Sequence, residues 1–291
     1  MSDRKLDFEK ALTRRYKAIM FDMDGTLTEP GHHEIPDDLM AKIGSLSTTL
    51  PMAICSGRRF EGILDKIQPF MDAAPDQALA RKNWHLFLEN GSIGIRYDVE
   101  KGEYDRFYQI DWPEEKISIQ AVFEEIQKRA PKIDECDMRI NECSIGVYPL
   151  HRGEYSKQKL AGITAELAQM TNEFLNDFDG RETVHVIDSG VAIHVIPTNG
   201  DKDRGIKEFA DILRNNWGMD LDEDARDILI VGDQPNKGCN DEKFLEGKCG
   251  TPFTAEHVVD GRLYPIPVFE NGVVLKGPSA TLSLLNQIKF A

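Results

Sequence analysis

Short apolar segments alternate with amphipathic segments along much of the chain. Runs rich in Ile, Val, Leu and Phe, each ending in polar or turn-forming residues, are KAIMFDMD (17–24), PMAICSG (51–57), WHLFLEN (84–90) and DILIVGD (227–233). Their length and composition predict buried parallel strands. Apolar residues recur at helical spacing in the segments IPDDLMAKIGSL, RRFEGILDKIQPFM and DKDRGIKEFADILRNN. This alternation predicts an α/β fold with a doubly wound parallel sheet.

Residues 91–197 follow a different rhythm. A hairpin near Lys101 is predicted first, then a helix and a strand-like stretch. A second long helix from Ser156 to about Phe178 follows, and after it two strands, TVHVIDS and VAIHVIP. A helix plus two strands therefore occurs twice, which predicts one α+β layer with a single sheet.

The change of rhythm also predicts the domain organisation. We expect residues 91–197 to form an inserted domain, because the strand–helix alternation before and after them belongs to one pattern. The core would then consist of residues 1–90 and 198–291, and a chain of 291 residues is long enough for about two domains.

Composition narrows the classes of partner. The formal net charge is -15, so the chain has little general attraction for nucleic acids or anionic membranes, and we expect neither as a partner. A charged N-terminal segment and the lack of long apolar runs predict a cytoplasmic protein without membrane spans. We expect a monomer or a homodimer, a choice that the sequence does not decide. The five cysteines show no CxxC spacing, which predicts reduced, structural thiols.

Paired carboxylates end the first predicted strand, in FDMDGTLT (21–28). Residues i and i+2 of a strand point to the same side with Cα atoms roughly 6.5 to 7 Å apart, so a phosphoryl group fits between Asp22 and Asp24. Ligands of open α/β sheets bind at the carboxyl ends of the strands. Asp-Gly is also a common turn dipeptide, so the pair taken alone fits a ligand site or a turn.

Two other segments offer groups that suit an anion. Ser56 and Gly57 lie at a strand-to-helix junction, where backbone N–H groups and the helix dipole favour negative charge. Lys202 stands just ahead of a helix. Either feature alone is weak, because Ser-Gly is ordinary loop punctuation and a lysine at a helix start is usually solvated.

The last predicted strand ends in further oxygen donors. Asp233 closes that strand, and Asn240 and Asp241 follow a short loop later. Hard oxygen ligands that converge from separate loops are those that Mg²⁺ takes. His32 and His33 are better explained as exposed loop histidines than as a metal pair. Asp-x-Asp, Ser, Lys and Asp at four segment ends together predict a phosphate site with a magnesium ion.

In their order, these motifs resemble those of a known family. DMDGT (22–26), CSGR (55–58), DKDRG (201–205) and GDQPNKGCND (232–241) resemble the four motifs of the haloacid dehalogenase superfamily. The long insertion and LENG (88–91) resemble its subfamily IIB, which contains Cof-type sugar phosphatases, sucrose-phosphate phosphatase and eukaryotic-type phosphomannomutase. The resemblance extends from about residue 17 to about residue 260. It implies a Rossmann-like core with an inserted C2-type cap domain.

The resemblance also implies a role for each matched residue. It makes Asp22 the nucleophile that forms an aspartyl-phosphate and Asp24 the general acid and base. The implied phosphate-binding groups are Ser56, the N–H of Gly57 and Lys202. The implied Mg²⁺ site consists of Asp22, the main-chain carbonyl of Asp24, and Asp233, with Asp241 and Asn240 as water-mediated or more distant partners.

Substrate choice is implied to reside in the insertion. PLHRGEY (149–155) resembles the place where phosphomannomutases carry an arginine for the distal phosphate, and it offers Arg152. In the strand VAIHVIP the chain departs from those mutases, with Ala192 and His194 where they have a serine and an aspartate. Arg58, Arg152 and His194 are candidate substrate-binding residues. A histidine packed at a domain seam and a solvated arginine fit the sequence equally well.

These observations favour a Mg²⁺-dependent phosphatase that hydrolyses a small phosphorylated metabolite, with sugar phosphates as the leading class. A phosphohexomutase of the phosphomannomutase kind is the alternative, and a catalytically idle metabolite-binding protein is the competitor from another class. The presence of Asp22, Asp24 and Lys202 argues against the idle protein. The departure at residues 192 and 194 favours water over sugar as the final phosphoryl acceptor.

Overall fold

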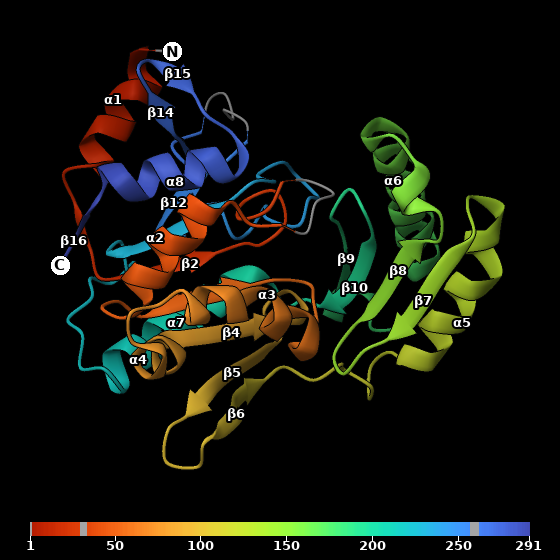
Figure 1. Ribbon diagram of the computed structural model, residues 1–291. Helices are drawn as coiled ribbons and strands as arrows, with labels where there is room; N and C mark the ends of the chain where they lie inside the picture. The colour runs from red at the N-terminus through yellow and green to blue at the C-terminus, as the bar shows by residue number, and fades with distance from the viewer. Residues whose placement is uncertain (1, 30–33, 257–261) are drawn as a thin grey trace.

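The computed structural model describes residues 2–29, 34–256 and 262–291 and shows an α/β fold built around two sheets (Figure 1). The pair His32 and His33 lies outside the described residues. In spatial order, the large sheet consists of β13 (Ile266–Pro267), β12 (Thr251–Thr254), β11 (Ile228–Gly232), β2 (Ala18–Phe21), β3 (Met52–Cys55), β4 (Trp84–Leu88), β5 (Ile93–Asp98) and β6 (Glu103–Gln109). The strands from β13 to β4 run parallel. The doubly wound parallel sheet that the sequence predicts is therefore confirmed.

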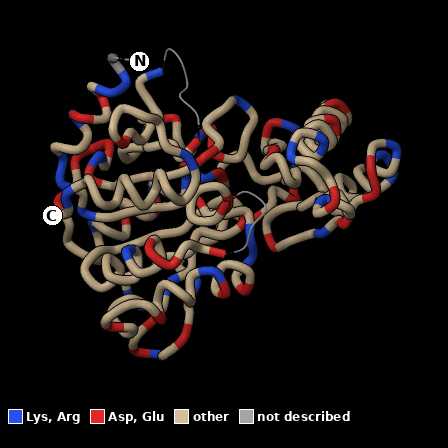
Figure 2. The backbone as a smooth tube through the Cα atoms, turned by 45° about the horizontal axis from the view of Figure 1, so that its top comes forward, with Lys and Arg blue, Asp and Glu red and all other residues tan. Residues whose placement is uncertain are grey.

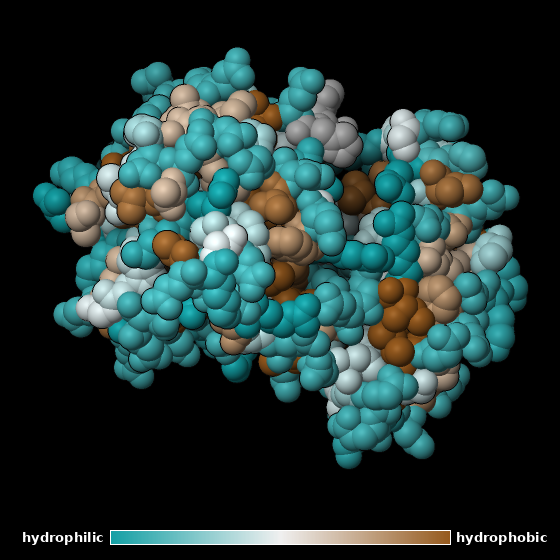
Figure 3. Space-filling model, turned by 60° about the horizontal axis from the view of Figure 1, so that its bottom comes forward, coloured by the Kyte–Doolittle hydropathy of each residue, from teal (hydrophilic) through white to brown (hydrophobic). Residues whose placement is uncertain are grey.

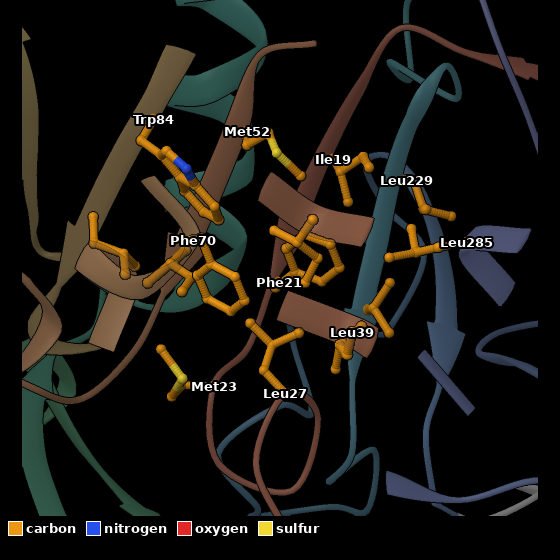
Figure 4. Close-up of a cluster of buried hydrophobic side chains, with 14 of the residues drawn as sticks. Ile19, Phe21, Met23, Leu27, Leu39, Met52, Phe70, Trp84, Leu229 and Leu285 are labelled. Atoms are coloured by element: carbon orange, nitrogen blue, oxygen red, sulfur yellow. The ribbon is translucent and has the colours of Figure 1, made fainter. Parts of the chain in front are cut away.

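Helices cover both faces of this sheet, because its central strands are apolar on both sides. In β2, Ala18 and Met20 face α7 (Lys202–Asn215), while Ile19 and Phe21 face the opposite layer. That layer contains α2 (Asp37–Ser47), α3 (Phe60–Asp72) and α8 (Gly277–Gln287). Figure 4 shows Ile19 and Phe21 gathered with side chains of this layer, where Phe70 of α3 stacks on Trp84 with ring centroids 5.8 Å apart.

The chain ends add a further layer that the sequence predicted only in part. The segment 262–276 suggests in sequence a small β extension before a last helix, and the structure agrees: β13 joins the large sheet, and β14 (Phe269–Glu270) and β15 (Val273–Val274) form a hairpin before α8. Not anticipated were α1 (Ser2–Ala11), α4 (Gln77–Asn83) and the pair of β1 (Arg15–Tyr16) with β16 (Lys289–Phe290). Phe8 anchors α1 by packing between Phe253 and Phe269.

The hairpin β5–β6 corrects the expected extent of the insertion. The sequence pattern assigns residues 93–109 to the insertion that begins at residue 91, but β5 pairs antiparallel with β4, with Leu88 opposite Ile93. Strand pairing therefore places the hairpin in the large sheet. Alternating polarity predicts a hairpin but does not identify the strand with which the hairpin pairs. Here the hairpin follows β4 directly in the chain and pairs with the free edge of that strand.

The second sheet follows the predicted helix-plus-two-strands repeat. It is antiparallel, in the order β7 (Cys136–Ile140), β8 (Ile145–Pro149), β10 (Ile193–Pro197) and β9 (Val184–Asp188). The helices α5 (Ile119–Arg129) and α6 (Lys157–Leu175) pack against one face. Short 3₁₀ turns occur at η1 (Glu89–Gly91), η2 (Ala130–Lys132), η3 (Arg152–Glu154) and η4 (Arg181–Thr183). We call residues 111–197 the small unit and the rest the large unit.

Both crossings of the chain between the two units pass one buried residue, Ser92. The backbone N–H of Ile110, where the chain enters the small unit, donates to the carbonyl oxygen of Ser92 at 2.8 Å. The Ser92 hydroxyl donates to the carbonyl oxygen of Gly200, where the chain has returned, also at 2.8 Å. The two connecting segments are thereby held side by side.

Charged residues of both signs occur on the surface of both units. Lys and Arg are interspersed with Asp and Glu along both units (Figure 2), and the face in Figure 3 is mostly hydrophilic with small, separate hydrophobic patches. Within the described ranges, no helix has the length and apolar character needed to cross a membrane. All five cysteines are free, as the sequence predicts.

Candidate functional site

Three aspartates meet where β2 and β11 end. Asp22 follows β2 and its N–H donates to the carbonyl oxygen of Val231 in β11 at 2.8 Å, so the ends of these strands stay together. Asp233 follows β11, and Asp241 lies a loop later. One carboxylate oxygen from each of these buried residues lies within 4.8 Å of the others. In Figure 1 the arrow of β4, which runs parallel to β2, points toward the small unit, so this edge of the sheet faces it.

Lys202 connects two of these carboxylates. Its Nζ lies 2.6 Å from Asp22 Oδ1 and 2.6 Å from Asp241 Oδ1, and the residue is fully buried. Asp201 fixes the start of α7 because its carboxylate accepts a hydrogen bond from the Lys202 N–H at 2.7 Å. Burial alone would lower the pKa of Lys202, but the charges of Asp22 and Asp241 more than offset it and raise that pKa. The lysine is therefore a fixed cation beside Asp22.

Asp241 uses its second oxygen to shape the loop after β11. Oδ2 accepts hydrogen bonds from the N–H groups of Asp233 at 3.0 Å and Gln234 at 3.2 Å. A Cβ at Gly232 would lie 2.7 Å from this oxygen, so the close approach requires glycine. Both oxygens of Asp241 thus have protein partners, and this residue supports the position of Asp233.

The cluster carries more negative charge than one lysine neutralises. Burial, and after it the charge of Asp241, raises the pKa of Asp22 to about 7. The same two causes raise the pKa of Asp233 well above its usual range. Asp233 Oδ1 and Asn240 Oδ1 are buried without a hydrogen-bond partner. A dense set of hard oxygen donors with unused lone pairs fits a divalent cation such as Mg²⁺.

The strand-end loops approach too closely for a side chain at Gly25. Its φ is +85°, and a Cβ there would lie 2.1 Å from Asp233 Oδ2. The glycine of the DMDGT motif therefore lets the turn after β2 pass directly against the carboxylate that follows β11. The motif alone does not indicate this role for the glycine.

Asp24 lies apart from the three-aspartate cluster. Its carboxylate makes a bidentate ion pair with Arg58, with Arg58 Nη2 2.7 Å from Oδ1 and Nε 3.2 Å from Oδ2. The Asp24 side chain is 48% exposed and that of Arg58 is 31% exposed. Arg58 was expected at the rim for substrate; in this structure its partner is Asp24. The Asp24 carboxylate is thus partly open to solvent, unlike the three buried aspartates.

The loop after β3 is packed from both units. Ser56 is buried, and its N–H donates to the carbonyl oxygen of Phe87 at 3.0 Å. A Cβ at Gly57 would lie 3.1 Å from Asn90 Oδ1 and 3.4 Å from His194 Cε1. Neither polar atom of the Asn90 side chain has a partner, although both are buried. Asn90 was missed as a site residue, and the only sequence signal was its place in LENG.

His194 lies at the seam and Arg152 outside it. His194 is 5% exposed and packs edge-on against Tyr148, with ring centroids 5.7 Å apart. Burial, and then the charge of Lys202, lowers the pKa of His194 to about 4, so the imidazole is neutral near pH 7. Arg152 is exposed, with its guanidinium 5.4 Å from the ring centroid of Tyr148. Tyr148 therefore lies between the two predicted substrate-binding residues, and sequence analysis missed it.

No protein-family model matches the chain, and no curated protein sequence does. Solved structures do match, among them the C-terminal domain of C. albicans trehalose-6-phosphate phosphatase, with a TM-score of 0.64 and 16% identity over 98% of this chain and 95% of that one. A haloacid dehalogenase-like hydrolase from Bacteroides thetaiotaomicron also matches, with a TM-score of 0.53 and 16% identity over 82% of this chain and 88% of that one. The chain therefore shares its fold with these two proteins.

A third matching structure is a nucleotidase. It is an N-terminally truncated, IMP-bound Plasmodium falciparum IMP-nucleotidase, with a TM-score of 0.58 and 16% identity over 98% of this chain and 72% of that one. Likenesses at this identity show the fold. The assignment to subfamily IIB stays a prediction.

Proposed function

We propose that the chain is a Mg²⁺-dependent phosphatase that hydrolyses a small phosphate monoester through an aspartyl-phosphate on Asp22. The observation that carries the proposal is the Lys202 ammonium held 2.6 Å from both Asp22 and Asp241 at the strand ends. A buried carboxylate kept beside a fixed cation suits attack on a phosphate dianion, which it would otherwise repel. Two structural neighbours, a sugar-phosphate phosphatase and a nucleotidase, support this reaction class.

Asp22 and Asp24 divide the covalent and the proton-transfer work. An Asp22 carboxylate oxygen attacks phosphorus, and the bond from phosphorus to the ester oxygen breaks. Asp24 gives its proton to that departing oxygen, then takes a proton from water, which attacks the aspartyl-phosphate and frees Asp22. Asp24 is exposed enough to reach both positions once Arg58 releases it to bind substrate. Ser56 and the Gly57 N–H hold phosphoryl oxygens at the start of α3.

The residues that would hold Mg²⁺ are those with unused oxygens. Asp22 and Asp233 would bind it directly together with the Asp24 carbonyl oxygen, and Asn240 would bind it through water. Asp241, with both oxygens already engaged, would support Asp233. The bound ion would supply positive charge against the phosphoryl group.

Water is the proposed final acceptor. A mutase needs a second phosphate site in the small unit, and such a site requires several cationic or hydroxyl groups. The face toward the seam offers the neutral imidazole of His194, and Ala192, just before the strand that carries His194, is buried. Arg152 is exposed beyond Tyr148. A small phosphorylated metabolite with a hydroxyl-bearing leaving group, such as a sugar phosphate, is the proposed substrate.

Phosphate release from a panel of esters tests the proposal. The panel contains sugar phosphates, nucleoside monophosphates and p-nitrophenyl phosphate, each with Mg²⁺ and with chelator. We expect Mg²⁺-dependent release from at least one ester and none with Asp22→Asn. Release that persists in chelator, or in Asp22→Asn, would overturn the mechanism, and no release from any ester would favour an idle, metabolite-binding protein.

A second assay separates water from sugar as acceptor. Glucose 1-phosphate or mannose 1-phosphate is supplied with a catalytic amount of hexose bisphosphate, and 6-phosphate and free phosphate are followed together. We expect free phosphate without isomerisation. Isomerisation that is about tenfold faster than release would establish the mutase instead.

A further inference from the structure

Glu89, the acidic residue of LENG, is a buried carboxylate of the large unit that binds the small unit. It follows β4 and is 2% exposed. Its Oε1 accepts from the Glu142 N–H at 3.1 Å, and its Oε2 accepts from the Cys143 N–H at 3.0 Å and from the Ser144 hydroxyl at 2.7 Å. These three donors form the turn between β7 and β8. A carboxylate from one unit therefore binds the tip of a hairpin from the other.

The backbone at Glu89 is held in an uncommon conformation. Its φ is +47°, in the left-handed region that non-glycine residues seldom adopt. Its N–H donates to the carbonyl oxygen of Arg58 at 3.2 Å, and the next N–H, of Asn90, donates to the carbonyl oxygen of Ser56 at 2.9 Å. Glu89 is thus fixed to the loop that would bind phosphate. Its side chain extends from that loop to the small unit.

A second buried carboxylate, Asp201, also reaches the small unit but is used differently. It accepts from His185 Nε2 at 2.9 Å, while Lys243 lies 3.1 Å away and the Lys202 N–H also donates to it. Asp201 would keep partners in the large unit if the small unit moved. Among the described residues, every hydrogen bond of the Glu89 carboxylate goes to the turn at residues 142–144. Of these two carboxylates, only that of Glu89 would lose all of its hydrogen bonds if the small unit moved.

Other contacts also join the two units, but they hold the β7–β8 hairpin less firmly than the Glu89 carboxylate does. Asp188 exchanges backbone hydrogen bonds with the loop at residues 238–240, and Arg59 and Arg106 contact the hairpin through Asn141 and Glu142. Both chain crossings lie at Ser92, three residues from Glu89. Because the chain crosses between the units at one place, the angle between the small unit and the large unit depends on contacts elsewhere in their interface. The directional bonds of Glu89 restrict that angle more than an apolar contact would.

We infer that Glu89 is a positioning residue for substrate selection: its carboxylate fixes the β7–β8 hairpin so that Tyr148, and the His194 against which it packs, stand over the loop at Ser56 and Gly57. The inference rests on the proposed function. Tyr148 lies on β8 four residues after Ser144, and β8 pairs with β10, which carries His194. A hairpin released from Glu89 would leave these two side chains without a fixed place above the phosphate loop.

Glu89→Gln tests the inference, with Glu142→Gln as matched control. The control changes an exposed carboxylate of the same turn, which pairs with Arg106 at 2.7 Å, and leaves the Glu89 acceptors in place. Hydrogen exchange at the amides of residues 142 and 143 is the readout that needs no activity. We expect exchange about tenfold faster in Glu89→Gln and unchanged in the control, because a hydrogen bond to a charged group is lost. Unchanged exchange in Glu89→Gln would overturn the inference.

Kinetics with two substrates provide the second readout. For the best sugar phosphate from the panel, we expect Glu89→Gln to raise KM about tenfold while kcat and the kinetics of p-nitrophenyl phosphate stay within about threefold. Equal losses on both substrates would mean that Glu89 supports the reacting groups themselves and would overturn the positioning role. If the wild-type protein releases phosphate from no ester, the proposed function fails, and the exchange readout alone decides whether Glu89 fixes the hairpin.

Should Glu89→Gln not fold, Ser144→Ala removes one of the three bonds and leaves the two backbone donors. The same changes are then expected at about threefold rather than tenfold. No change in exchange in Ser144→Ala would count against the inference.

Discussion

The site in the large unit and the facing surface of the small unit are built on opposite principles. Lys202 and Asp241 are fully buried, and their charged atoms have partners about 3 Å away or closer. Across the seam, His194 is buried but neutral, and Arg152 is exposed beside an aromatic ring. Buried charges with fixed partners tolerate few substitutions, whereas exposed side chains beside a ring can be replaced with less loss of stability. The chemistry is thus expected to depend on the large unit and the choice of substrate on the small unit.

The sharpest test of this division is Asp22→Asn. The amide has nearly the same volume and keeps an oxygen near Lys202, but it cannot accept a phosphoryl group. We expect kcat to fall by about 10³-fold or more on every substrate while the protein stays folded. Phosphate release and circular dichroism measure the two effects. Activity that survives with ordinary magnesium dependence would remove Asp22 as nucleophile.

Lys202→Met measures how strongly the buried charges depend on one another. Removing the ammonium leaves Asp22 and Asp241 buried without their common cation, so we expect the free energy of unfolding to fall by about 3 to 5 kcal/mol. Urea unfolding checks this. Lys207→Met on the same helix is the control, because Lys207 is exposed and its ion pair with Asp203 is worth at most about 1 kcal/mol. Similar losses in both variants would contradict the assignment.

A buried neutral histidine in each unit predicts acid sensitivity. Burial lowers the pKa of His85, in the large unit, and of His194, in the small unit, to about 4 from the usual 6.5. The unfolded chain therefore binds more protons below pH 6.5, and stability that is present above that pH is lost as the pH falls toward 4. Between pH 7 and 5, the wild type should lose about 2 kcal/mol more than His85→Phe or His194→Phe.

Urea unfolding at half-unit pH steps gives the two slopes. His85 packs among Phe107, Phe209 and Trp217, so phenylalanine is a suitable replacement there. If His194→Phe keeps the wild-type slope while His85→Phe flattens it, His194 is protonated in the folded protein and open to solvent. His194 would then not be the buried, neutral side chain that we contrast with the charged site of the large unit.

The smallest expected effect is that of Arg152→Ala. Because Arg152 is exposed and distant from the reacting groups, its loss should raise KM for the best substrate about tenfold and leave p-nitrophenyl phosphate unaffected. Arg139→Ala is the matched control: Arg139 also lies beside Tyr148, but it pairs with Asp137. Equal effects of Arg152→Ala on both substrates would make Arg152 a structural residue.

Sequence was sufficient where local pattern determines structure. The strands β2, β3, β4 and β11 were predictable because a buried parallel strand is apolar on both faces, and their carboxyl ends must share one edge. That rule places Asp22 beside Asp233. It could not place the β5–β6 hairpin, since polarity within a hairpin does not identify the neighbouring strand. Nor could it find α1, which Phe8 anchors through partners more than 200 residues away.

The residues that the sequence did not predict near the site were also missed because their contacts join distant segments. Asn90 lies against Gly57 and Tyr148 packs on His194, and in each case the partner comes from a distant segment of the chain. Asp24 was assigned from its motif, but its pairing with Arg58 depends on how two loops meet. The sequence therefore predicts which groups gather at the strand ends more readily than it predicts which of them pair with each other.

Ser92 makes the small unit a replaceable module. Because the outgoing chain at Ile110 and the returning chain at Gly200 both bind this one residue, cutting at the two positions leaves ends that lie next to each other. A short linker can close that gap, and a different insertion can be joined there without altering the register of any strand in the large sheet. Chimeras built at this junction would carry a different small unit on an unchanged large unit.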